Sequence, residues 1–173
     1  MKQQDRNKAW GFTLFGDDVR VEVGGKISLM GLYQADMFFP NNIKFPVALP
    51  RFCMLVMYYE IRGALEDDIT FKVTFGTENT SLVEIPVLRK DLNESIGDQT
   101  IPEDTAPEDK ERIFHSRFPI ALSPFSIPGV GRLRVRAHYS DGSILKLGSI
   151  AVRQTSVEEF NKMLAIGPVP TPP

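Results

Sequence analysis

The sequence predicts an all-β fold: an antiparallel β-sandwich, C2-like or immunoglobulin-like, with about eight to ten short strands and one short C-terminal helix. Runs of alternating apolar and polar residues recur along the chain, and this period of two is typical of half-buried strands. Clusters of glycine, proline, asparagine and aspartate separate the runs, as expected for turns. Together these two observations favour a sandwich over a helical or α/β fold.

Composition indicates one globular domain. The chain has 173 residues, 42% hydrophobic and 24% charged, and a net charge of −2 that argues against nucleic-acid binding. It has no apolar run long enough to span a membrane, and its polar start is not that of a secretory signal. Its single cysteine excludes an intramolecular disulfide, so we expect a cytoplasmic protein. We expect a disordered arm over 1–9, a single domain over 10–166 and a proline-rich tail over 167–173.

The clearest strand pair is a hairpin over residues 19–33. Valines alternate with charged residues on its first strand, and an apolar face continues on its second. We expect Gly24, Gly25 and Lys26 to form the loop, since glycines supply the positive φ angles of tight turns. The predicted pairs are Val23 with Ile27, Val21 with Leu29 and Glu22 with Ser28.

The middle of the chain supplies most of the remaining strands. The run 51–61 is apolar on both faces and would also suit a buried helix, but the preceding Pro50 favours a central strand. Pro86 predicts an edge or a bulge, Pro119 a break, and 124–128 a turn region. The other predicted strands cover 10–15, 36–39, 69–75, 81–88, 112–122, 132–139 and 143–152.

A long acidic segment, 90–111, interrupts the strands, and we expect it to be a flexible loop. Asp91, Asn93 and Ser95 have EF-hand spacing, but Ile96 and Pro102 occupy positions that need glycine and glutamate, so no calcium loop is predicted. Aspartates at strand connections leave a second hypothesis, in which loops of a C2-like sandwich bind calcium or an anionic surface. They are Asp17, Asp18, Asp67, Asp68 and Asp141.

The helix is predicted at the C-terminal end of the domain. Ser156 and Glu159 form a capping box, and Val157, Phe160 and Leu164 share one face. So short a helix is marginal alone, so we expect it to dock on the sheet. Replacing a fully buried phenylalanine there by alanine would cost about 3–5 kcal/mol.

A second hairpin, around Asp141 and Gly142, carries the candidate site. Its inward pairs are predicted to be Leu133 with Ser149, Val135 with Leu147 and Ala137 with Leu145, closed by a type I turn with a glycine bulge. The opposite face would carry a basic row able to bind an acidic partner, unless it is merely solvated or pairs with the acidic loop 90–111. The row comprises Arg132, Arg134, Arg136 and His138, with Lys146 opposite Arg136.

Residues for catalysis are few. His115 and His138 are the only histidines, and the known hydrolase, nucleotide and metal motifs are absent from the sequence. Cys53 lies within an apolar run and is expected to be buried. No catalytic residue, metal site or cofactor is predicted. Trp10, Phe12 and Phe15 could form an exposed aromatic patch, but we expect at least two of them to lie in the core.

Three stretches resemble an uncharacterised family of small bacterial and phage proteins: 12–33, 49–53 and the 133–147 hairpin. The resemblance implies a small β-rich protein, cytoplasmic or phage-encoded, and carries over no catalytic residue. We therefore expect a non-enzymatic binding or assembly module, whose partner is another protein or a second copy meeting it at an edge strand.

Overall fold

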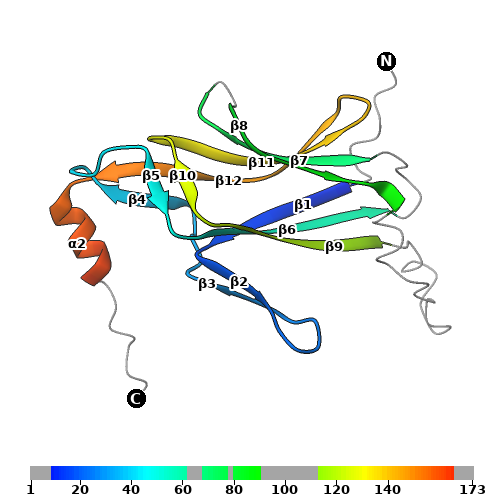
Figure 1. The fold of residues 1–173 in the computed structure, drawn as a ribbon, viewed down its shortest axis with the longest axis horizontal. Coiled ribbons are helices and arrows are strands. Elements are labelled where there is room, and N and C mark those ends of the chain that lie inside the picture. Colours follow the sequence, from blue (N-terminus) through cyan, green and yellow to red (C-terminus); the bar gives the residue numbers. More distant parts are fainter. Residues whose placement is uncertain (1–8, 62–67, 78–79, 91–112, 166–173) are drawn as a thin grey trace.

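The computed structural model describes residues 9–61, 68–77, 80–90 and 113–165, which form twelve strands and the helix α2. Most of the strands lie in two sheets that face each other, with a two-stranded hairpin projecting from one of them (Figure 1). The all-β prediction is confirmed. The expected N-terminal arm up to residue 8, the acidic loop from residue 91 and the C-terminal tail lie outside the described residues.

The smaller sheet is antiparallel, with β6 between the other two strands. Along β6, Phe52, Met54, Val56 and Tyr58 point into the core and are fully buried. A strand covered on both faces reads as continuously apolar, which explains why this run also suited a helix. The strands are β1 (Ala9–Gly16), β6 (Phe52–Ile61) and β9 (Ile113–Leu122).

The larger sheet has five strands in the order β4-β12-β11-β7-β8. β4 pairs in parallel with the last part of β12, which corrects the expectation of a wholly antiparallel fold. β4 uses the edge of β12 opposite to β11, so that Ala151 and Val152 pair with both neighbours. The strands are β4 (Asp36–Pro40), β7 (Ile69–Phe75), β8 (Thr80–Val87), β11 (Gly131–Tyr139) and β12 (Ile144–Thr155).

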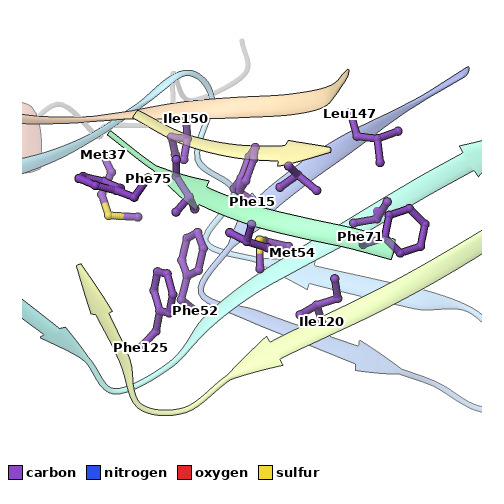
Figure 2. Packing of buried hydrophobic residues seen from close by; sticks show 14 of the residues in the cluster. Phe15, Met37, Phe52, Met54, Phe71, Phe75, Ile120, Phe125, Leu147 and Ile150 are labelled. Carbon is purple, nitrogen blue, oxygen red and sulfur yellow. The ribbon is translucent and has the colours of Figure 1, made fainter. Parts of the chain in front are cut away.

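One hydrophobic core lies between the two sheets (Figure 2). Phe52 is at its centre and stacks on Phe125, with 5.0 Å between ring centroids. Phe125 belongs to a short pair not expected from the sequence, β5 (Val47–Leu49) with β10 (Phe125–Ile127). The predicted turn over 124–128 is therefore wrong, because Phe125 and Ile127 are buried in the core.

The β11–β12 hairpin keeps the predicted register only near its turn. Gly142 has a φ of 83° and donates its amide to the Tyr139 carbonyl, as the predicted type I turn with a glycine bulge requires. Beyond the turn, Leu147 is an extra residue in β12, so the predicted register is wrong by one. The observed pairs are Arg136 with Lys146 and Ala137 with Leu145, then Val135 with Gly148 and Leu133 with Ile150.

The bulge lies where β1 packs against β12. Leu147 points into the core, and its Cδ2 would be 2.7 Å from a Cβ atom at Gly11 of β1. A Cβ atom at Gly148 would likewise meet Thr13 at 3.4 Å. The two sheets thus approach each other closely where both strands carry glycine. This close approach depends on tertiary packing, which the local sequence does not reveal.

The first hairpin forms, but in a register two residues from the predicted one. β2 (Asp18–Val21) and β3 (Ile27–Met30) pair Val21 with Ile27 and Val19 with Leu29. The Glu22 amide donates to the Lys26 carbonyl, so Val23 lies at the tip and is 99% exposed. A shift of two residues leaves every side chain on its predicted face, which is why alternation alone could not fix the register.

The helix α2 (Val157–Ala165) begins as predicted and contacts the five-stranded sheet at its edge strand β4. The Glu159 amide donates to Ser156 Oγ at 3.1 Å, forming the expected cap. Its principal neighbour is β4, and it extends beyond the end of the sheets (Figure 1). Leu164 is 71% exposed and Phe160 only half-buried, so the docking buries only part of the apolar side, and the cost of Phe160→Ala must be lower than a fully buried site would give.

Two prolines mark edge strands. Pro86 lies in β8, at the edge of the five-stranded sheet, as predicted. Pro119 was expected to break its strand, but β9 continues through it. β9 is also an edge strand, and Pro119 has no amide hydrogen to donate. An edge strand can therefore accommodate proline where the nitrogen is directed away from the neighbouring strand, here β6.

Candidate functional site

The predicted basic row lies on the outer face of the five-stranded sheet. Along β11, Leu133, Val135 and Ala137 are fully buried, and the alternate residues face outward. The side chains on this face come from β7, β11 and β12, and the registers of the three strands bring them together. We call the following set the basic face: Lys72, Arg132, Arg134, Arg136, His138 and Lys146.

Three cations form a row across the strands of this face. Lys146, Arg136 and Lys72 occupy directly paired positions, and Glu84 of β8 continues the row. Glu84 Oε1 accepts from Lys72 Nζ at 3.0 Å, and this hydrogen bond holds the pKa of Glu84 below its ordinary value. The row thus contains three cations and one carboxylate, so it carries excess positive charge. The sequence located only part of it, because Lys72 is distant along the chain.

Arginines of the basic face also bind their own protein. Arg134 Nη1 donates to the Gly76 carbonyl at 2.5 Å and to the Arg132 carbonyl at 3.3 Å, and Arg132 Nη1 donates to Ser149 Oγ at 2.9 Å. Lys146 is exposed and, within the described part of the chain, has no hydrogen bond or ion pair. The members of the face are therefore unequal, and reversal of charge at Arg134 would also remove contacts within the sheet.

His138 lies at the end of the basic face and is half-buried. Burial lowers the pKa of His138, and the charges of Lys72 and Arg136 lower it further. Its Nε2 is buried and has no protein hydrogen-bond partner among the described residues. His138 is thus neutral at neutral pH and adds no charge to the face.

The outer face of the three-stranded sheet is aromatic, and it includes Tyr59 and His115, which the sequence did not connect with Trp10 and Phe12. Register places Trp10, Tyr59 and His115 in one row across β1, β6 and β9. The next row consists of Phe12, Met57 and Arg117. We call these two rows the aromatic face.

The first row is a stack of rings. The centroids of Trp10 and Tyr59 are 5.6 Å apart with planes 5° from parallel, and those of Tyr59 and His115 are 4.7 Å apart at 17°. Trp10 is 39% and Phe12 46% exposed, whereas Phe15 is buried. The expectation that two of these aromatic residues lie in the core is wrong, because alternation along β1 turns Trp10 and Phe12 outward.

The β6 part of the remaining outer face is covered. The β2–β3 hairpin lies over it, so that Leu55 is buried and Cys53 has no exposed surface, as predicted for the cysteine. A Cβ atom at Gly16 would lie 2.9 Å from Leu29 Cδ1 of β3, which shows how closely the hairpin packs. The aromatic face is the half that the hairpin leaves open.

A buried polar cluster joins the two sheets near one end. Glu60 of β6 is 2% exposed, and both of its carboxylate oxygens accept from the Arg89 guanidinium. Glu60 also accepts from the Tyr58 hydroxyl at 2.7 Å, which lies 3.2 Å from that of Tyr139 in β11. Burial opposes the charge of Arg89, but the hydrogen bonds and charge of Glu60 outweigh it and raise the pKa of Arg89. With its oxygens occupied, Glu60 fits a structural role.

A sequence signal for this cluster exists. Along β6, Glu60 alternates in phase with the inward-facing residues from Phe52 to Tyr58. A buried carboxylate needs a cationic partner. The partner, Arg89, follows β8 and could not be chosen from sequence alone.

The described aspartates at strand connections each have a local partner. Asp18 pairs with Arg20 and Arg51, both at 2.9 Å, and Asp17 accepts from Tyr33 at 2.6 Å. Among the described residues, no three histidine, cysteine, aspartate or glutamate side chains gather as a metal site would require. Asp67 and the acidic loop from residue 91 lie outside those residues.

The two histidines lie on opposite sides of the molecule. His115 belongs to the aromatic face and His138 to the basic face, so they do not share a site. No helix within the described ranges is long and apolar enough to cross a membrane.

Comparison of the chain with protein-family models, with curated proteins and with solved structures finds no significant match. Function therefore has to be argued from the two faces themselves.

Proposed function

We propose that this protein is a non-enzymatic binding module whose basic face holds an acidic segment of a protein partner. The main support for this proposal is the row of Lys146, Arg136 and Lys72 at paired positions, where Glu84 is the one carboxylate beside three cations. Like charges opposite each other destabilise a sheet, so such a row favours a role outside stability. An extended acidic chain lying across the strands would place a carboxylate near each cation.

Arginine and lysine contribute differently to such a surface. Arg136 offers a planar fork that suits a carboxylate, whereas Lys146 and Lys72 act as mobile point charges. Because the face is a sheet surface, its cations are spaced by the strands at about 4.8 Å, less than the roughly 6.6 Å between same-side side chains of an extended peptide, and the long side chains of lysine and glutamate can span the difference. The resulting contact would be polar and strongly dependent on salt.

The direct test is titration with a poly-L-glutamate peptide, followed by fluorescence anisotropy at low salt. Lys72→Glu combined with Lys146→Glu should reduce the affinity at least tenfold, because two attractions become repulsions. The matched control is Lys26→Glu with Lys44→Glu, which changes the net charge equally away from the face. It should bind nearly as the native chain does.

An equal loss of peptide affinity in both double variants would show that only the net charge of the protein matters, and it would contradict the proposal. Vesicles containing phosphatidylserine form a second arm of the experiment. Binding to vesicles without binding to the peptide would favour the alternative, an anionic surface as the ligand. Arg134→Glu is less suitable, since it also removes the bonds to the Gly76 and Arg132 carbonyls.

Three further parts of the proposal concern architecture, family and location. The two facing sheets support a β-sandwich, for which C2-like or immunoglobulin-like topology remains our working description. The motifs at 12–33, 49–53 and 133–147 support membership of the uncharacterised bacterial and phage family. A reducing cytoplasm suits a chain whose single cysteine is buried.

A further inference from the structure

Two apolar surfaces of the described chain lack a partner. One is the aromatic face, where Trp10 and Phe12 remain well exposed. The other is the apolar side of α2, where Val157 and Leu164 are exposed, with the exposed Met163 beside them. Exposed apolar surface of this kind marks interaction sites when it is contiguous.

The helix has a physical need for a partner. It has nine residues, and isolated helices of that length are marginal in water. Its cap and its Glu158–Lys162 pair at 2.7 Å stabilise it only slightly, since exposed ion pairs contribute little. Packing of its apolar side against another surface would provide the missing stabilisation.

Charge makes the two surfaces complementary. The aromatic face carries Arg117, which is exposed and forms no ion pair within the part of the chain that the structure describes. Neither of its two rows contains an acid. The helix, in contrast, has Glu158 and Glu159 in its first turn, beside Val157. An acidic apolar helix fits a cationic aromatic sheet face.

The two surfaces of one molecule are too far apart to meet. The helix α2 lies beside β4 at one end of the fold, and β1 begins at the opposite end (Figure 1). Trp10 and Phe12 lie in the first half of β1. The helix that covers the aromatic face must therefore come from another molecule.

We propose that the protein self-associates by placing α2 of one copy on the aromatic face of a second copy. Val157 and Leu164 would cover Phe12 and the edges of the stacked rings, and Glu158 would approach Arg117. The face has the composition of interface hot spots, in which tryptophan, tyrosine and arginine are enriched. This inference uses different residues from the basic face, so either proposal can fail alone.

The test compares three apolar-to-lysine variants by sedimentation velocity. Phe12→Lys alters the face, Leu164→Lys alters the helix, and Val23→Lys is the matched control, because Val23 is exposed at the hairpin tip. The native chain and Val23→Lys should show a sedimentation coefficient that rises between about 1 µM and about 500 µM, a range suited to small interfaces. Phe12→Lys and Leu164→Lys should each remain monomeric.

Mixing the two defective variants gives the decisive result. The helix of Phe12→Lys and the face of Leu164→Lys are both intact, so an equimolar mixture should regain association and form a heterodimer. A contact of face with face or helix with helix would leave one variant still self-associating, which would overturn the proposal. A native chain that stays monomeric throughout the range would also overturn it.

A charge exchange keeps the proposal testable if a lysine variant fails to fold, as judged by circular dichroism. Arg117→Glu and Glu158→Arg should each weaken self-association at least tenfold at low salt, because each places like charges on the face and on the helix that meets it. In their equimolar mixture, every face meets a helix of opposite charge from the other variant, so association should return. The double variant, with the two charges exchanged, should also associate. Continued loss in both the mixture and the double variant would contradict the contact.

Discussion

The two outer faces of the molecule use the same backbone geometry for opposite chemistry. The five-stranded sheet turns cations outward, with Lys146, Arg136 and Lys72 in one row. The three-stranded sheet turns rings outward, with Trp10, Tyr59 and His115 in one row. In both, cross-strand register brings together side chains that are distant in sequence. The difference lies in what holds each row, since rings stack on one another whereas cations repel.

The contrast predicts that the faces differ in their importance for stability. Removal of a ring from the aromatic row loses contacts within the row, but removal of a cation from the basic row relieves repulsion. The two sheets are nevertheless one folding unit, because they share the core and the buried cluster around Glu60. Single substitutions can therefore separate the stability that each face contributes from the stability that both sheets share.

The largest effect is expected at the cluster joining the sheets. Glu60→Ala leaves the Arg89 guanidinium largely buried without its counter-ion, so the free energy of unfolding should fall by about 3–5 kcal/mol. Urea unfolding measures this, with Glu158→Ala in the exposed pair as a control of little effect. A loss at Glu60 no greater than at Glu158 would show that the cluster does not connect the sheets.

The next effect should distinguish the two faces. Tyr59 stacks on both Trp10 and His115, so Tyr59→Ala should lower the free energy of unfolding by about 2 kcal/mol. Lys146→Ala, on the basic face, should leave it almost unchanged or raise it slightly. Equal losses in the two variants by urea unfolding would remove the proposed difference between the faces.

Acid should weaken the fold through the histidines. Burial lowers the pKa of both His138 and His115 below the ordinary 6.5, so the unfolded chain binds these protons first. Stability should therefore fall as the pH drops through about 6.5, before carboxylates titrate below about 4.5. His138→Gln should reduce this slope in urea unfolding measured from pH 7.5 to 5. An unchanged slope in both His138→Gln and His115→Gln would contradict the assignment.

The smallest effect is spectroscopic and reports on the aromatic face alone. Trp10 is the only tryptophan, so acrylamide quenching of fluorescence measures its exposure directly. Quenching should be efficient in dilute solution and should decrease modestly as the concentration rises, because association would cover the face. Addition of poly-L-glutamate should leave the quenching unchanged. Protection of Trp10 by the peptide would place the acidic ligand on the wrong face.

The success of sequence analysis depended on how local each feature is. The basic row was found because Arg132, Arg134 and Arg136 alternate along one strand and Lys146 follows across one hairpin. Core burial was preferred over an exposed aromatic patch because β1, β6 and β9 contribute one residue each to a row, and no local pattern pairs Trp10 with Tyr59. Strand alternation is local, but strand order is set by the whole core.

The errors have the same origin. Alternation fixed the faces of the first hairpin and not its register, which a shift of two residues leaves equally well satisfied. The bulge at Leu147 follows from the approach of Gly11 in a different sheet. The helix cap at Ser156 was predicted because capping is local, whereas the extent of α2 docking depends on tertiary packing, and β4 covers only part of its apolar side.

The most direct test of two distinct faces is amide chemical-shift mapping by nuclear magnetic resonance, with poly-L-glutamate titration and self-dilution measured on one sample. The titration should perturb amides around Lys72, Arg136 and Lys146 and leave β1 unaffected. Dilution should perturb Trp10, Phe12 and α2 and leave the basic face unaffected. If the titration and the dilution perturb the same amides, or if either perturbs none, the account is contradicted.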